Sequence, residues 1–184
     1  MATGGDAIIL IGFMGAGKSC TGVELCRRTG LAAYDTDAIV VRKMTSSIED
    51  IFDNLGEDIF REQETAALRE IPRRPAVVIT GGGAVLREEN IEVMRQLGTI
   101  VWLQADAETI FRRIGHREDR PLLRGGNARA RIAELLRARE ELYREAAEIM
   151  VETSTKSPAE VAESILAELG FASKAGVAEA GWLR

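Results

Sequence analysis

A glycine-rich loop near the N-terminus constrains the fold of this chain more than any other feature. The segment Gly12–Ser19 reads GFMGAGKS, and the apolar run Ala7–Ile11 precedes it. This matches G-x-x-x-x-G-K-[ST], a loop between a strand and a helix whose glycines bring backbone N–H groups close to phosphate oxygens. A plain glycine-rich turn is the alternative, but the flanking strand and helix patterns argue against it. We therefore expect a nucleotide triphosphate, with Lys18 on its outer phosphates and Ser19 on Mg²⁺.

Short apolar runs alternate with longer helical patterns along the rest of the chain. This alternation predicts parallel βαβ units and a doubly wound α/β sheet. The expected strands are Ala7–Ile11, Leu31–Tyr34, Ala76–Thr80, Thr99–Leu103 and Glu148–Val151. The expected helices lie near residues 17–29, 37–54, 57–71, 88–97, 107–114, 128–146 and 158–169.

Composition and charge exclude several other classes of protein. The chain has 184 residues, a net charge of −5, and 46% hydrophobic and 29% charged residues, which suits one globular domain. The acidic balance argues against a nucleic-acid-binding surface, and no apolar run approaches a membrane span. Cys20 and Cys26 fall in one expected helix on different faces, so we expect no disulfide between them and a reducing, cytoplasmic setting.

Two further clusters follow expected strands and share an edge of the sheet with the glycine-rich loop. Residues 35–37 read DTD, and residues 81–83 read GGG. Ligands of open parallel sheets bind outside the carboxyl ends of the strands. Asp35 is placed to hold a water molecule of the Mg²⁺ shell. Asp37 is placed to accept a hydrogen bond from a substrate hydroxyl and to help remove its proton. The alternative for Asp37 is a plain N-cap of a helix starting at Ala38.

Two arginines border or interrupt apolar helix faces. Arg61 flanks a stripe that contains Phe60, and Glu64, at i+3, is able to orient its guanidinium. Arg139 falls inside an apolar stripe, where a buried guanidinium requires a partner. A substrate carboxylate and an internal acid satisfy that requirement equally well. The pair suggests a small, anionic, hydroxylated substrate, with Phe52 and Phe60 as an apolar wall; a surface ion pair is the alternative for Arg61.

The charged segment over residues 111–124 is typical of a mobile cover over a site. It contains Arg120, which is able to neutralise charge on phosphates during their transfer. The alternative is a solvated loop. His116 lies in the same segment and is expected at the surface, because no second histidine and no nearby cysteine accompany it.

Taken together, the motifs resemble the shikimate kinase family over about residues 7–170. The resemblance rests on GFMGAGKS, DTD, FRxxE (Phe60–Glu64), TGGG (Thr80–Gly83), RPLL (Arg120–Leu123) and RxxLY (Arg139–Tyr143). It implies a three-layer P-loop NTPase fold, with a five-stranded parallel sheet in the order 2-3-1-4-5 and a mobile lid at about residues 114–125. It further implies a single domain over 1–170 and a C-terminal tail over 171–184.

The family transfers the γ-phosphate of ATP to the 3-hydroxyl of shikimate, on the route to chorismate and the aromatic amino acids. By resemblance, catalysis falls to Lys18, Asp37 and Arg120, and the metal site to Ser19 and, through water, Asp35. The shikimate contacts implied are Asp37, Arg61, Gly82, Gly83 and Arg139. The ATP contacts implied are Gly15, Ala16, Gly17, Lys18, Ser19, Cys20, Arg113, Arg120 and Pro158.

The resemblance also implies one Mg²⁺ per subunit and a cytoplasmic monomer without nucleic-acid or membrane partners. Two alternatives remain open at this point. A gluconate kinase shares the loop and lid plan and also takes a hydroxylated carboxylate, although DTD and TGGG favour shikimate. A nucleotide-dependent regulator without catalysis is disfavoured, because Lys18, Asp35, Asp37, Arg61 and Arg139 are all present.

Overall fold

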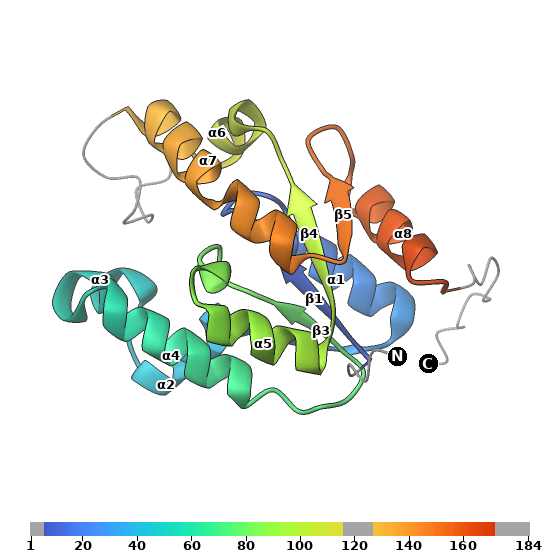
Figure 1. Ribbon diagram of the computed structural model, residues 1–184, viewed down its shortest axis with the longest axis horizontal. Coiled ribbons are helices and arrows are strands. Elements are labelled where there is room, and N and C mark those ends of the chain that lie inside the picture. The colour runs from blue at the N-terminus through green and yellow to red at the C-terminus, as the bar shows by residue number, and fades with distance from the viewer. Residues whose placement is uncertain (1–5, 116–126, 172–184) are drawn as a thin grey trace, which may run out of the picture.

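Five strands form one parallel sheet in the order β2-β3-β1-β4-β5 (Figure 1). The computed structural model describes residues 6–115 and 127–171. The α/β class and the strand order expected above are confirmed. The strands are β1 (Ala7–Ile11), β2 (Ala32–Asp35), β3 (Ala76–Ile79), β4 (Gly98–Gln104) and β5 (Ile149–Glu152).

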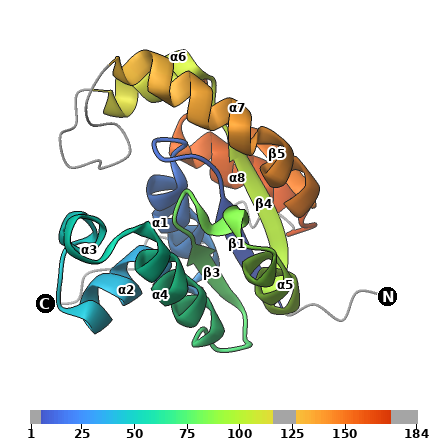
Figure 2. The same cartoon turned by 60° about the vertical axis from the view of Figure 1, so that its left-hand side comes forward.

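Helices cover both faces of the sheet. Figures 1 and 2 show α1 and α8 side by side on one face, with α4, α5 and α7 on the other. The short helices α2 and α3 pack beside α4, beyond the β2 edge, and α6 packs on α7. The helices are α1 (Lys18–Thr29), α2 (Thr36–Met44), α3 (Ile48–Leu55), α4 (Glu57–Arg69), α5 (Glu88–Leu97), α6 (Ala107–Ile114), α7 (Ala128–Ala146) and α8 (Pro158–Glu168), with a 3₁₀ turn η1 (Ala84–Leu86).

The central strands form the core because helices cover both of their faces. Every residue of β1 and of β3 is buried, as their unbroken apolar sequences require. The edge strand β2 has no fully buried residue. Cys20 is exposed and Cys26 half-buried, and both are free thiols, as expected. Among the described helices, none combines the length and apolar character that a bilayer span requires.

The prediction of a single helix over residues 37–54 is wrong, because the structure has two helices there. Thr45 ends α2 in the left-handed region, with φ at 51°. Ser47 then starts α3, and its side chain accepts the N–H of Asp50. A serine placed to cap a new helix competes with continuation of the old one. The break turns α3 back toward α4, against which it packs.

Close strand packing makes Gly98 sensitive to substitution. A Cβ at this position would lie 2.0 Å from the carbonyl oxygen of Ala7 on the paired strand. We expect Gly98→Ala to lower the free energy of unfolding by about 3 kcal/mol, because backbone atoms of β1 must move. For a chain of this size the melting temperature should fall by about 10 °C, measurable by circular dichroism.

The matched control for Gly98→Ala is Gly30→Ala at the end of α1. A Cβ on Gly30 meets nothing within 4 Å, so only its left-handed backbone, with φ at 75°, opposes the change. That conformational cost is about 1 kcal/mol. Equal losses of stability in the two variants would contradict the steric account of Gly98.

Candidate active site

The loop between β1 and α1 presents backbone donors and one ammonium group. Gly15 and Gly17 take positive φ values of 80° and 103°, and Gly17 caps α1 without a side-chain bond. The N–H groups at the start of α1 are therefore not used by a side-chain cap. Lys18 is buried, and its Nζ donates to the carbonyl oxygens of Gly12 at 2.7 Å and Phe13 at 3.0 Å. The ammonium group is thus held against the loop itself.

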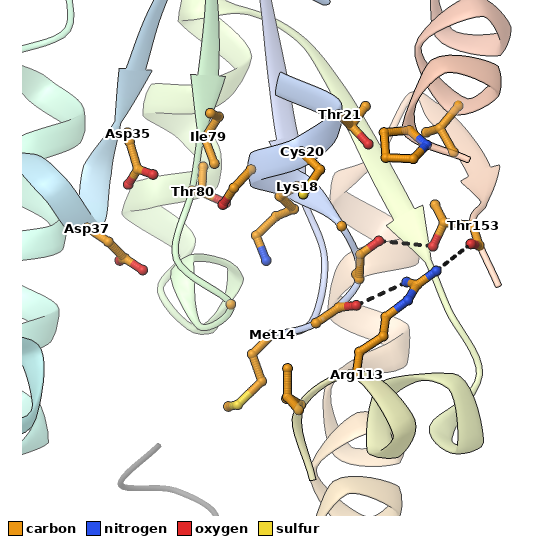
Figure 3. A pocket seen from close by; sticks show the side chains of 18 of the residues that line it. Met14, Lys18, Cys20, Thr21, Asp35, Asp37, Ile79, Thr80, Arg113 and Thr153 are labelled. Atoms are coloured by element: carbon orange, nitrogen blue, oxygen red, sulfur yellow. Dashed lines mark hydrogen bonds between the residues drawn. The ribbon is translucent and has the colours of Figure 1, made fainter. Parts of the chain in front are cut away.

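This loop borders a cavity of about 490 Å³ that suits a nucleotide. Figure 3 shows Asp35 and Asp37 on one side of the loop, Arg113 on the other, and the Lys18 amine between them. The ATP contacts implied by the sequence all line this cavity where they are described. They are Gly15, Ala16, Gly17, Lys18, Ser19, Cys20, Arg113 and Pro158.

The DTD segment lines the same cavity, and the helix cap within it differs from the alternative considered for Asp37. Helix α2 begins at Thr36, and Asp35 rather than Asp37 is its N-cap. The Asp35 Oδ1 accepts the N–H of Ala38 at 3.1 Å. The interpretation of Asp37 as an N-cap of a helix from Ala38 is therefore wrong. Asp37 lies in the first turn of α2 and also lines the cavity, together with Asp35.

Arg113, near the end of α6, bridges two segments of the cavity wall. Its guanidinium donates to the carbonyl of Gly15 at 3.0 Å and to that of Thr153 at 2.8 Å (Figure 3). Thr153 follows β5 and donates its hydroxyl to the Ala16 carbonyl at 2.9 Å. The sequence reasoning missed Thr153 and also Lys156, which lines the same cavity. Their position after the fifth strand was the available signal, because ligands gather at strand ends.

A second, smaller cavity of about 70 Å³ adjoins the first. Phe52 of α3 and Phe60 of α4 form one wall, with ring centroids 5.0 Å apart, as expected for an apolar wall. Arg61 and Arg139 also line it. Met14, Asp37 and Gly82 line both cavities, so they mark the junction between the two.

Arg61 is fixed in the smaller cavity by carboxylates of its own helix. Its guanidinium bonds Glu64 at 2.8 Å and Glu57 at 2.9 Å. Burial opposes the charge of Arg61, but these carboxylates hold its pKa above the ordinary value. Burial raises the pKa of Glu64 and the charge of Asp37 adds to this, while the charges of Arg61 and Lys18 oppose it. The expected orientation of Arg61 by Glu64 is thus present, with both side chains buried.

The three glycines after β3 lie close against the protein's own atoms, two of them against side chains and one against backbone. A Cβ on Gly81 would lie 2.3 Å from Glu64 and 2.7 Å from Asp37, and one on Gly83 would lie 2.3 Å from Arg61. A Cβ on Gly82 would approach the backbone nitrogen of Met14 to 3.0 Å. From the sequence, these glycines are expected to allow close contact with a ligand. The structure adds that charged groups of the site lie directly over this backbone.

Arg139 of α7 is buried, as its place in an apolar stripe suggested, but its partner is neutral. It donates to the carbonyl of Gly82 at 3.3 Å and lies over the ring of Phe13 at 5.8 Å. No carboxylate in the described part of the chain pairs with it. Its guanidinium therefore lines the smaller cavity without an ion-pair partner among residues 6–115 and 127–171.

Two residues singled out in the sequence, Arg120 and His116, lie outside the described residues, as does most of the expected lid at 114–125. In the described chain, a phosphate-binding loop with its lysine adjoins a pocket with two arginines and a carboxylate at the junction. This arrangement defines a P-loop kinase that acts on a small anionic acceptor.

Comparison with known proteins agrees with this class. A sequence model of the shikimate kinase family matches residues 14–170. The shikimate kinase of Nitrosospira multiformis is 40% identical over 170 residues, covering 92% of this chain and 87% of the relative. That of Moorella thermoacetica is 43% identical over 159 residues, covering 86% of this chain and 91% of the relative.

Solved structures agree as well. The shikimate kinase from Acinetobacter baumannii, in complex with shikimate, superposes with a TM-score of 0.85 at 36% identity, covering 95% of this chain and 97% of that one. The shikimate kinase from Aquifex aeolicus superposes with a TM-score of 0.77 at 33% identity, covering 92% of this chain and 99% of that one. The chain belongs to the shikimate kinase family.

Proposed function

We propose that this enzyme transfers the γ-phosphoryl group of ATP to the 3-hydroxyl of shikimate, giving 3-phosphoshikimate and ADP. The observation that carries the proposal is the junction between the two cavities. Asp37 lines both the cavity of the phosphate loop and the pocket of Arg61 and Arg139. A donor in the first and an acceptor in the second would therefore meet beside one carboxylate, as in-line transfer requires.

On the donor side, the phosphate loop binds the ATP phosphates through its backbone N–H groups and Lys18. Lys18 exchanges its two loop carbonyls for phosphate oxygens, which are stronger acceptors for an ammonium group. Arg113 and Pro158 flank the adenine. The guanidinium of Arg113 already donates to the carbonyls of Gly15 and Thr153, and these two bonds fix its plane.

On the acceptor side, the carboxylate of shikimate binds between Arg61 and Arg139. Arg139 faces the pocket with no carboxylate partner in the described chain, so an anion there compensates its charge. Asp37 accepts the hydrogen of the reacting hydroxyl, and the backbone of Gly82 and Gly83 contacts the ring. These positions suit an acceptor with an acid at one end and a hydroxyl at the other.

Ser19 and Asp35 fit a Mg²⁺ ion, one per subunit. They line the same cavity and supply a hydroxyl and a carboxylate, the hard oxygen donors that this ion takes alongside phosphate and water. Capping of α2 uses Oδ1 of Asp35, and a carboxylate has a second oxygen. When bound, the ion neutralises charge on the phosphates.

We further propose that the enzyme is a cytoplasmic monomer with small-molecule substrates only, serving chorismate and aromatic amino acid synthesis. Residues 1–170 form the single domain, residues 114–125 a lid that carries Arg120, and 171–184 a tail. Light scattering coupled to gel filtration tests the monomer.

Turnover on two acids tests the substrate. We expect ADP release, coupled to NADH oxidation, to depend on shikimate and to be at least about a hundredfold faster, as kcat/KM, than with gluconate. Both are hydroxylated carboxylates, but the rigid ring matches the wall of Phe52 and Phe60. Faster turnover of gluconate would favour the gluconate kinase alternative. ATP binding without phosphorylation of either acid would favour a regulator.

A further inference from the structure

Tyr143 on α7 is fully buried beside the acceptor pocket, and no step described so far uses it. Its ring stacks on Trp102 of β4, with centroids 5.7 Å apart and planes inclined by 20°. Its hydroxyl donates to the carbonyl of Gly82 at 2.5 Å. Burial raises the pKa of this phenol, so the hydroxyl keeps its proton at neutral pH and remains a donor.

The Gly82 carbonyl receives a second donor from the same helix. Arg139, one turn before Tyr143, donates to it at the longer distance of 3.3 Å. Gly82 itself lies at the junction of the two cavities, close against the backbone of Met14 in the phosphate loop. This one peptide therefore borders both the donor cavity and the acceptor pocket.

Binding of the acceptor substrate affects the two hydrogen-bond donors differently. Arg139 lines the pocket, and a substrate carboxylate there is a much stronger acceptor than a carbonyl. Turning toward it breaks or weakens the bond to Gly82. The Gly82 carbonyl is part-buried in these contacts, and leaving it without a protein donor under a bound substrate would oppose that movement. Tyr143, held by its stack on Trp102, stays on the carbonyl.

We propose that Tyr143 is a positioning residue whose hydroxyl holds the Gly82 carbonyl, so that Arg139 is released to bind the acceptor carboxylate. The inference rests on the proposed function, because it takes shikimate as the source of that carboxylate. It assigns the tyrosine of the RxxLY motif a task separate from packing. Without the hydroxyl, Arg139 is the remaining donor to this carbonyl in the described chain and must leave it to bind substrate.

The Tyr143→Phe variant keeps the ring and removes only the hydroxyl. We expect its KM for shikimate to rise about tenfold while its KM for ATP stays within about twofold of wild type. The same split should appear in shikimate dissociation constants from calorimetry. KM does not depend on the amount of folded enzyme, so a variant that is only less stable loses apparent kcat and leaves both KM values alone.

Two controls separate the hydroxyl from other effects. Tyr34→Phe removes the chain's only other phenol, which accepts a bond from Arg74 at the surface, and should leave both KM values unchanged. The methyl ester of shikimate lacks the carboxylate. The KM ratio of Tyr143→Phe to wild type should therefore be close to one for the ester, because Arg139 has no anion to reach.

The outcomes distinguish this inference from the proposed function. Wild-type turnover of shikimate with an unchanged shikimate KM in Tyr143→Phe overturns the role of Tyr143 and leaves the function intact. An equal rise in KM for the acid and its ester also overturns it, because the hydroxyl then acts without Arg139. Wild-type enzyme that does not turn over shikimate contradicts both proposals.

Discussion

The Lys18→Ala variant is expected to lose about a thousandfold in kcat. During transfer, negative charge is spread over the oxygens of the moving phosphoryl group, and a fixed ammonium group stabilises it. Lys18 is buried in the wall of the nucleotide cavity and already held by the Gly12 and Phe13 carbonyls. Its charge is thus in place before the reaction, where little water screens it.

Steady-state ADP release with both substrates saturating measures this loss. Lys43→Ala is the matched control, since Lys43 forms a surface ion pair with Glu70 and should keep wild-type kcat. Thermal melting of both variants should give similar midpoints, because the two Nζ bonds described for Lys18 go to carbonyls of its own loop. A kcat for Lys18→Ala within tenfold of wild type would contradict the role given to this lysine.

The Asp37→Asn variant is expected to lose about a thousandfold in kcat as well, with a shikimate KM within a few-fold of wild type. Asparagine keeps the size of the side chain and one hydrogen-bonding oxygen. It lacks the negative charge and the basicity needed to take the proton of the hydroxyl. Asp37 lines both cavities, so this loss falls where donor and acceptor meet.

Single-turnover measurements on Asp37→Asn separate the chemical step from product release. Asp58→Asn, at an exposed position in the first turn of α4, is the control and should leave kcat unchanged. A large rise in shikimate KM with a normal kcat would mean that Asp37 only binds the acceptor. Another group would then have to take the proton of the reacting hydroxyl.

Several parts of the site could be predicted from the sequence because local chemistry determines them. The phosphate loop needs glycines with positive φ at Gly15 and Gly17, and no other residue type adopts that backbone as readily. The clusters at 35–37 and 81–83 follow strands of one parallel sheet, so they share an edge with the loop. Arg61 and Glu64 are one helical turn apart, and their ion pair follows from that spacing.

Other parts depend on competition between neighbouring signals. The pattern over residues 37–54 is helical throughout, yet Thr45 and Ser47 divide it in two. Both Asp35 and Asp37 are good capping residues, and only the end of β2 decides that Asp35 caps α2. The N-cap considered from the sequence and the N-cap observed differ by two residues, which is within the usual uncertainty of a helix boundary.

The sequence by itself determined the α/β class, the phosphate loop and the residues that flank it, because turn chemistry and strand periodicity act over a few residues. Only the tertiary structure decided that Arg139 and Tyr143 both donate to the Gly82 carbonyl, across sequence separations of 57 and 61 residues. Only it decided that Asp37 lines two cavities at once. Such contacts arise from how α7 packs on η1 and β4, and no local pattern encodes that packing.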